Sequence, residues 1–225
     1  MRQRSGREVK DALYEQFARV GKALSSPKRV EILDLLGQAE RTVEALSQAT
    51  GMGVTNTSAH LQVLKGARLV ETRKEGTKVY YRLADDEVSS LYVAFRDVAS
   101  HRLAEVEQIA RDYFAARDEL EPLTRHELRK RMRGEDVVVV DVRPKEEYAA
   151  GHIPGAISLP VAELLDGIEE LPADAEVVAY CRGPYCVLAP EAVEILRRRG
   201  FRTRRLEDGF PEWRLAGLPV AVGEG

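Results

Sequence analysis

A short apolar run near the end of the chain, residues 177–180, leads through the segment CRGPYC, residues 181–186, into a helical pattern. A valine-rich run at 136–142 and a further predicted strand at 201–206 alternate with helical patterns in the same region. Strands that alternate with helices predict a parallel α/β sheet, in which ligand chemistry lies at the carboxyl ends of the strands. We therefore expect Cys181 to follow a central strand, where a reactive group is favoured.

Both cysteines of the chain lie in this segment, as Cys181 and Cys186. A turn from a strand into a helix points backbone N–H groups and the positive end of the helix dipole at the first side chain, so we expect the Cys181 thiol to favour its anionic form. Buried, unreactive cysteines are the alternative. The clustering and the Gly-Pro turn favour a reactive or redox-active pair. The candidate residues of this loop are Cys181, Arg182, Gly183, Pro184, Tyr185 and Cys186.

The length of 225 residues predicts one large domain or two modest ones, and a composition of 44% apolar and 32% charged residues is typical of a globular protein. No apolar run approaches the ~20 residues of a membrane span, and the polar N-terminus lacks a signal-peptide core, so we expect a cytoplasmic protein with no membrane partner. The net charge is +6 over residues 1–82, −6 over 83–121 and −3 over 122–225. A basic first third suits nucleic acid, although an excess of this size also occurs on ordinary surfaces.

The basic first third has the pattern of four helices and a hairpin. Apolar residues at helical spacing predict helices over 7–24, 27–37, 43–50 and 54–66. Ser26 and Pro27 suit the start of the second helix, Gly37 its end, and Thr42 the cap of the third. The turn GMG, residues 51–53, joins the last two into a helix-turn-helix whose second member can enter a DNA major groove. Alternating residues then predict a hairpin over 69–83 with a charged tip at 73–78.

The fourth helix and the hairpin tip supply the candidate DNA contacts. On the helix we expect polar side chains that point outward and touch phosphates or base edges. The basic residues of the hairpin tip are those of a wing that rests on the DNA backbone. A helical bundle with a hairpin and a solvated polar face is the alternative interpretation. The candidate residues are Thr55, Asn56, Thr57, Ser58, His60, Gln62 and Lys65 on the helix, and Arg73, Lys74 and Lys78 on the wing.

The segment TSAHLQVLKGARLV, followed by RKEGTKVYYRL, resembles the recognition helix and wing of the ArsR family of bacterial repressors, and the resemblance extends over roughly residues 13–84. It implies a transcriptional repressor that binds double-stranded operator DNA as a homodimer on an inverted repeat. It also implies that Ser58, His60 and Gln62 lie near the groove, with Arg73, Lys74 and Lys78 on the wing.

A third segment, residues 86–117, predicts one long helix with an apolar seam close to a heptad repeat. The ArsR resemblance implies that this helix and the first one build the dimer interface, whereas packing against the chain's own second domain is the alternative for part of the seam. Family members that sense metals carry cysteines in the third helix or paired acid and histidine ligands on the last helix. Here residues 42–46 read TVEAL, and His101 has only Glu105 one turn on. We therefore expect no metal site and no cofactor. The seam residues are Val88, Tyr92, Phe95, Ala99, Leu103, Val106, Ala110 and Tyr113.

The segment LEPL, residues 120–123, breaks the helix and predicts domains over 1–121 and 122–225. Thr124 and Glu127 form a capping box that starts a new helix. Short helices at 146–150, 161–165 and 210–216 complete the alternating pattern.

The segments VVVVDVRPKEEYAAGHIPGAISLP, VVAYCRGPYC and LEDGFPEWRLAGLPV together resemble a single rhodanese domain over about residues 123–222. The resemblance implies that Cys181 is a sulfur-accepting nucleophile carried as a persulfide, with residues 182–186 as its backbone cradle. It also implies that Asp141 and Arg143 fix the loop and the sheet edge. The expected fold class is thus a mainly α winged helix-turn-helix followed by an α/β rhodanese-like parallel sheet.

Two departures from related domains narrow the chemistry. Phosphatase-like relatives use Cys-x5-Arg, but Val187 stands six positions beyond Cys181, so oxyanion reduction and dephosphorylation are not expected. The second departure is Cys186. Its thiol can attack a persulfide on Cys181, which releases sulfide and leaves a disulfide, or a tri- or tetrasulfide can bridge the two cysteines. The alternative is that Cys186 simply packs at the helix start.

Two functions remain open on this evidence. One is a transcriptional regulator whose rhodanese domain senses or accepts reactive sulfur, or a related thiol-reactive signal, through Cys181 and Cys186. The other is a sulfurtransferase that forms a persulfide on Cys181, with the N-terminal domain serving mainly for dimerisation.

Overall fold

The computed structural model describes residues 5–114, 122–134, 137–172 and 174–223. The chain divides into two compact units, Met1–Tyr92 and Val93–Gly225. The predicted domain boundary between residues 121 and 122 remains a prediction, since residue 121 lies outside the described residues. None of the helices in these ranges combines the length and apolar composition of a membrane span.

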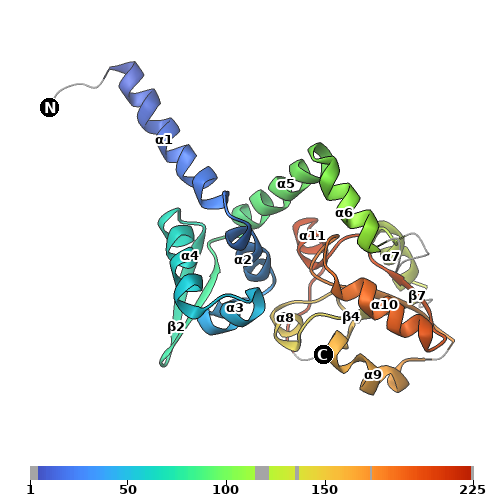
Figure 1. Ribbon diagram of the computed structural model, residues 1–225. Coiled ribbons are helices and arrows are strands. Elements are labelled where there is room, and N and C mark those ends of the chain that lie inside the picture. The colour runs from blue at the N-terminus through green and yellow to red at the C-terminus, as the bar shows by residue number, and fades with distance from the viewer. Residues whose placement is uncertain (1–4, 115–121, 135–136, 173, 224–225) are drawn as a thin grey trace. The chain divides into compact units, whose positions relative to one another are not determined.

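Four helices open the first unit, as the apolar periodicity predicts (Figure 1). The Ser5 hydroxyl forms a capping box with Glu8, and the Thr42 hydroxyl accepts a hydrogen bond from the backbone N–H of Ala45. The expected hydroxyl cap at Ser26 is wrong, because this side chain makes no capping hydrogen bond. The second helix nevertheless begins at Pro27, whose missing N–H has no helical partner at that position. The helices are α1 (Gly6–Leu24), α2 (Pro27–Gln38), α3 (Val43–Thr50) and α4 (Val54–Gly66), so α2 ends one residue beyond the predicted Gly37.

A three-stranded antiparallel sheet follows the helices. The predicted hairpin is formed by β2 (Val70–Glu75) and β3 (Lys78–Leu83), and the short strand β1 (Arg41–Thr42) pairs with the other side of β3. The core of this unit contains the inward residues of all four helices and the base of the hairpin. Leu61 and Leu64 of α4 are fully buried there, as their spacing predicts. The structure thus holds α4 against α2 and α3 and leaves its other side exposed.

The predicted single helix over 86–117 is wrong, because the structure has two helices, α5 (Asp86–Arg102) and α6 (Ala104–Phe114). At the break the N–H of Val106 bonds to the carbonyl of Leu103, three residues earlier, so the turn is tighter than in an α-helix. Neither proline nor glycine marks this position in the sequence. The predicted end at residue 117 lies outside the described residues.

The second unit contains a four-stranded parallel sheet with the strand order β5-β4-β6-β7. The central strands β4 and β6 are the valine-rich runs, which suits strands covered on both faces. Together the alternating strands and helices form the α/β unit that the sequence predicts. The strands are β4 (Val137–Asp141), β5 (Ile157–Ser158), β6 (Glu176–Tyr180) and β7 (Arg202–Arg205).

Two separate cores cover the two faces of this sheet. On one face α10 (Leu188–Arg198) and α9 (Leu164–Gly167) pack, and on the other α7 (Arg125–Met132) and α11 (Phe210–Leu215) (Figure 1). The capping box of Thr124 and Glu127 opens α7 as predicted. The short helix α8 (Lys145–Ala150) follows β4. The predicted helix over 161–165 is instead the 3-10 turn η1 (Val161–Glu163), then α9, then η2 (Ile168–Glu170).

Candidate functional site

The cysteine loop occupies the predicted position between a central strand and a helix. Cys181 directly follows β6, and α10 begins at Leu188, two residues after Cys186. Both thiols are free, and the Cys181 Sγ lies 3.8 Å from the carbonyl of Gly183 and 3.9 Å from that of Cys186. The loop therefore folds back on Cys181 and brings the two cysteines together.

The proton affinities of the two thiols differ in the direction opposite to our expectation. Only 2% of Cys181 is exposed, and burial, followed by its hydrogen bond to Cys186, raises the pKa of the Cys181 thiol. Burial of Cys181 thus disfavours the anionic form that the sequence predicts for this thiol. The hydrogen bond from Cys181 lowers the pKa of the half-buried Cys186 thiol, with further help from the backbone at Leu188 and the charge of Arg182. Of the two thiols, Cys186 is therefore the stronger acid and Cys181 the weaker.

The side chain of Arg182 turns away from the sulfur atoms and pairs with Glu147 of α8. Its Nε and Nη2 donate to the two carboxylate oxygens at 2.7–3.1 Å, and Glu147 is completely buried. Two hydrogen bonds between planar groups fix the orientation of both. Arg182, the second residue of the loop, thus anchors the loop to the neighbouring helix α8. The sequence predicts no role for Glu147, although this residue is the second glutamate of the rhodanese-like segment RPKEEY.

A buried ionic network holds the strand beside the cysteine loop. Asp141 and Arg143 are fully buried and form two close hydrogen bonds, Nε to Oδ1 at 2.9 Å and Nη2 to Oδ2 at 2.6 Å. The hydroxyl of Tyr180, the residue before Cys181, donates to the same Asp141 Oδ2 at 2.6 Å and accepts from the N–H of Ile153. The network joins the ends of β4 and β6, which is the supporting position that the rhodanese resemblance implies for Asp141 and Arg143.

The segment before α11 packs directly beneath the loop. The N–H of Phe210 donates to the carbonyl of Cys181 at 3.0 Å. A methyl group on Gly209 would lie 2.2 Å from the backbone N of Gly183 and 2.3 Å from the carbonyl carbon of Arg182, so only glycine fits without a shift of the loop. The sequence did not single out Gly209, although the third rhodanese-like segment contains it.

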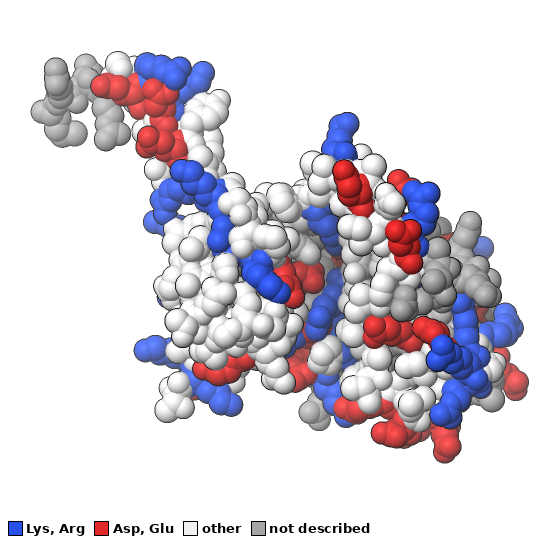
Figure 2. Space-filling model, viewed as in Figure 1, with Lys and Arg blue, Asp and Glu red and all other residues white. Residues whose placement is uncertain are grey.

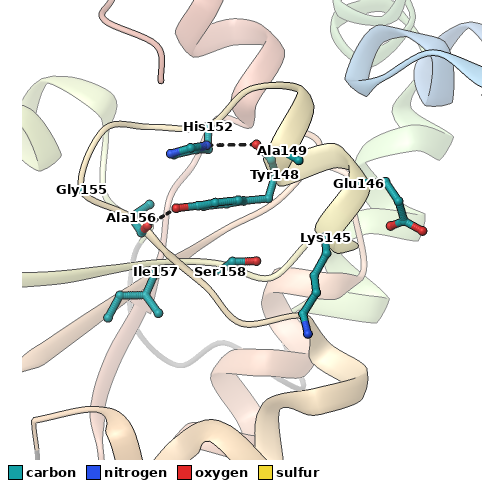
Figure 3. A pocket seen from close by; sticks show the side chains of 9 residues that line it. All are labelled: Lys145, Glu146, Tyr148, Ala149, His152, Gly155, Ala156, Ile157 and Ser158. Carbon is teal, nitrogen blue, oxygen red and sulfur yellow. Dashed lines mark hydrogen bonds between the residues drawn. The ribbon is translucent and has the colours of Figure 1, made fainter. Parts of the chain in front are cut away.

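Several cavities surround these elements. One of about 360 Å³ adjoins the loop and is lined by residues after the ends of β4 and β5 together with Arg182 and Leu188. A larger one of about 880 Å³ lies between α8 and β5, where the rings of Tyr148 and His152 stack at 3.7 Å (Figure 3). None of the cysteine-loop residues is among the described residues that line this larger cavity. The smaller cavity is therefore the better candidate approach to the loop.

On α4 most of the candidate DNA contacts face outward. Thr55, Asn56, Gln62 and Lys65 are exposed, and Ser58 and His60 are half-buried. Thr57 contradicts the expectation, because its side chain is fully buried and its hydroxyl donates to the carbonyl of Gly53 at 3.1 Å. Thr57 therefore supports the start of the helix and is not available to DNA.

The basic side chains predicted on the wing differ in their ion pairing. Lys74 and Lys78 are exposed, and basic and acidic side chains lie together at the end of the hairpin (Figure 2). Arg73 forms ion pairs with Glu40 and Glu75, and the carboxylates raise its pKa further. The sequence predicts no partner for Arg73, since Glu40 lies more than thirty positions away. One of the three predicted wing contacts is thus neutralised within the chain.

Comparisons with known proteins match two separate parts of the chain. Residues 26–72 match the family described as bacterial regulatory protein, arsR family, and residues 124–216 match the rhodanese-like domain. The HTH-type transcriptional regulator Rv0324 of Mycobacterium tuberculosis is 53% identical over 214 residues, which cover 95% of this chain and 94% of the relative. A sulfurtransferase of Allochromatium vinosum is 37% identical over 92 residues, which cover 40% of this chain and 84% of that protein.

Among solved structures, the homodimeric winged helix-turn-helix domain of Mb0332 from Mycobacterium bovis, a possible ArsR-family regulator, is 51% identical and has a TM-score of 0.42. The similarity covers 46% of this chain and 94% of that fragment.

A winged helix-turn-helix with an exposed polar recognition helix, followed by a rhodanese-like unit with a cysteine loop, defines a DNA-binding transcriptional regulator with a fused rhodanese-like domain. The chain belongs to the ArsR family of bacterial regulatory proteins and carries a C-terminal rhodanese domain.

Proposed function

We propose that the cysteine pair accepts reactive sulfur and that this modification changes the affinity of the chain for operator DNA. The observation that carries the proposal is the pairing of the chain's two thiols in one loop, where Cys181 is buried and Cys186 half-buried. A thiolate that is partly accessible and has a neighbouring thiol is suited to accept sulfur and then to close a bond to its neighbour.

The proposed chemistry has two balanced steps. The Cys186 thiolate attacks a sulfur atom of inorganic polysulfide, which forms a Cys186 persulfide and releases the shortened polysulfide. Cys181, once deprotonated, attacks the Cys186 Sγ, which forms a Cys181–Cys186 disulfide and releases hydrosulfide. The two thiols are oxidised and the polysulfide sulfur is reduced to sulfide. The rhodanese resemblance assigns the first attack to Cys181, whereas the pKa directions support Cys186.

The proposed partner of the first unit is double-stranded DNA, bound by a homodimer that acts as a repressor. Exposed polar residues on α4 and exposed lysines on the wing support the DNA contact. Exposed apolar side chains on α1 and α5, the helices that the ArsR resemblance places in the dimer interface, support the homodimer. These side chains are Val9, Leu13, Tyr14 and Phe17 on α1, and Leu91, Phe95 and Val98 on α5.

The test compares the full-length chain with a double variant, Cys181→Ser with Cys186→Ser. Each protein is incubated anaerobically with inorganic polysulfide and then titrated against a duplex selected from random sequence for binding to the reduced chain. We expect the Kd of the natural chain to change by about 5-fold or more, within the usual range of coupling between two sites, and the Kd of the variant to stay constant. Intact mass distinguishes added sulfur from the loss of two hydrogens. An unchanged Kd of the natural chain after complete modification contradicts the proposal.

A sulfurtransferase is the second candidate, and the cavity beside Arg182 and Leu188 favours it as an entry for a small sulfur donor. Steady-state transfer from thiosulfate or polysulfide to a small thiol discriminates between the two. Turnover near the ~10 per second of a typical enzyme supports catalysis as the main activity. Single-turnover modification with no further transfer supports the regulator.

A further inference from the structure

We propose that Arg96 of α5 is a positioning residue that links the state of the cysteine loop to the helix that enters the winged-helix unit. This inference rests on the proposed regulatory function and names the contact through which the signal leaves the loop. Arg96 is absent from the motifs of the sequence and lies beside the apolar seam of α5, where nothing in the pattern distinguishes it from a solvent-exposed arginine.

The structure shows Arg96 in a buried ion pair. Only 16% of its side chain is exposed, and its Nη1 donates to Oε1 of Glu212, itself 7% exposed, at 2.5 Å. Its Nη2 donates to Asp97 at 2.9 Å. The Arg96 Nε is buried and makes no hydrogen bond within the described part of the chain. Because separating a shielded ion pair leaves a buried charge uncompensated, this contact resists rupture when its surroundings move.

The same ion pair touches the cysteine loop on two sides. The other carboxylate oxygen of Glu212 accepts from the N–H of Gly209 at 2.9 Å, and Gly209 packs against the backbone of Arg182 and Gly183. The Arg96 Nη1 itself lies 3.3 Å from the position that a methyl group on Gly183 would occupy. A displacement of Gly183 therefore acts directly on the Arg96 guanidinium, and a displacement of Gly209 acts on it through Glu212.

The loop also has space to move at this contact. Pro184 and Tyr185 line a cavity of about 510 Å³ together with Arg96, Ser100 and other residues of α5 and α11. A Cys181–Cys186 disulfide joins the two ends of the loop and therefore changes the backbone conformation of Pro184 and Tyr185 between them. This cavity provides the space for that change. Arg96 lines this cavity together with Pro184 and Tyr185 of the loop.

The helix α5 gives this contact a route to the DNA-binding unit. It is continuous from Asp86 to Arg102, and its first half contributes buried Val88 and partly buried Tyr92 to the core of the winged-helix unit. Val88, Tyr92 and Arg96 are spaced four residues apart and lie along one side of the helix. A rotation or shift of α5 driven at Arg96 therefore reaches packed residues of the other unit.

The test uses Arg96→Gln in the full-length chain, with Arg102→Gln as the matched control. Arg102 lies on the same helix, is exposed and makes no ion pair within the described residues. Each protein is measured before and after inorganic polysulfide treatment for intact mass, for Kd on the selected duplex, and for hydrogen exchange of the α5 amides without DNA. We expect Arg96→Gln to be modified to the same mass and to bind DNA in the reduced state within about 2-fold of the natural chain. We expect its Kd and its α5 exchange to change less than about 2-fold on modification, whereas Arg102→Gln responds as the natural chain does.

Glu212→Gln and the double variant complete a cycle, because the amide keeps an acceptor for Gly209 but removes the ion pair. If Arg96 acts through Glu212, then Arg96→Gln, Glu212→Gln and the double variant all lose the change in Kd and in α5 exchange to the same extent. If Arg96→Gln keeps the full change in Kd, the inference is overturned while the regulatory proposal stands. If the natural chain shows no change in Kd but its α5 exchange responds and that of Arg96→Gln does not, the regulatory proposal fails and the link stands. No change in the α5 exchange of the natural chain overturns the link.

Discussion

The recognition face of α4 and the cysteine loop differ in how their functional side chains are held. On α4 the candidate side chains other than Thr57 are exposed or half-buried and, apart from Lys65, carry no formal charge. Around the loop, Asp141, Glu147 and Glu212 are buried and each holds an arginine. The comparison indicates that single substitutions on α4 act locally, whereas those around the loop act on the folded state.

The largest expected effect is the loss of stability when the buried network of Asp141, Arg143 and Tyr180 is broken. Asp141→Ala leaves Arg143 without its carboxylate and removes the acceptor of Tyr180, and we expect a loss of about 3–5 kcal/mol in the free energy of unfolding. Denaturant unfolding of the full-length chain measures it. The exposed pair of Lys145 and Glu163 is the control, and Glu163→Gln should cost less than about 1 kcal/mol. Equal losses for both would remove the contrast between buried and surface contacts.

A smaller loss is expected from overpacking beneath the loop. The methyl group of Gly209→Ala would meet the backbone of Arg182 and Gly183 at less than 2.6 Å, so the loop must shift. We expect a cost of about 1–3 kcal/mol and a changed labelling rate of Cys186. In Gly21→Ala the methyl group meets open space in the last turn of α1, so this control should gain up to about 0.5–1 kcal/mol from helix propensity. A neutral Gly209→Ala would show that the loop adapts freely.

A third prediction concerns which of the two thiols of the loop reacts first. We expect iodoacetamide at pH 7 to label Cys186 about tenfold faster than Cys181, because burial raises the pKa of Cys181 and its hydrogen bond lowers that of Cys186. Peptide mass mapping over time measures the two rates. In Cys181→Ala the hydrogen-bond donor is lost, the pKa of Cys186 rises, and its labelling slows. Faster labelling of Cys181 in the natural chain would restore it as the first nucleophile.

Much of the fold follows from local rules that the sequence displays. The caps at Thr42 and Thr124, the turn at 51–53 and the alternation of strands and helices are short-range signals, and the structure confirms each. The break at Leu103 follows no such signal, because no proline or glycine is present and the apolar spacing continues across it. Local pattern alone could not reveal it.

The candidate residues were predictable by type but not by partner. Sequence spacing places Cys181 and Cys186 in one loop, yet the direction of their pKa shifts depends on burial, which only the folded chain defines. Thr57 falls on a polar stretch, and only the packing of α4 shows that it faces inward. Glu40, Glu212 and Glu147, which pair with Arg73, Arg96 and Arg182, each lie more than thirty positions from their arginine, and no periodic pattern connects such pairs.

The smallest expected effect tests an ion pair of the wing. Glu40→Gln leaves Arg73 paired with the exposed Glu75 alone, so its guanidinium is more available to a phosphate. We expect tighter binding to the selected duplex at low salt and a dependence of log Kd on log salt steeper by about 0.9, the value for one phosphate contact. Arg73→Gln should have little effect in the natural chain but remove the gain in the Glu40→Gln background, whereas Lys74→Gln should weaken binding in both.

The pH dependence of this pair follows from the same contact. The hydrogen bond from Arg73 lowers the pKa of Glu40, so its small contribution to stability is present above the ordinary glutamate pKa of about 4.3 and is lost as the pH falls through the lowered value. The unfolding curves of the natural chain and Glu40→Gln should therefore converge in acid. An unchanged salt dependence for Glu40→Gln would show that Arg73 does not reach DNA even when it is released, and that the wing contacts phosphate through Lys74 and Lys78 alone.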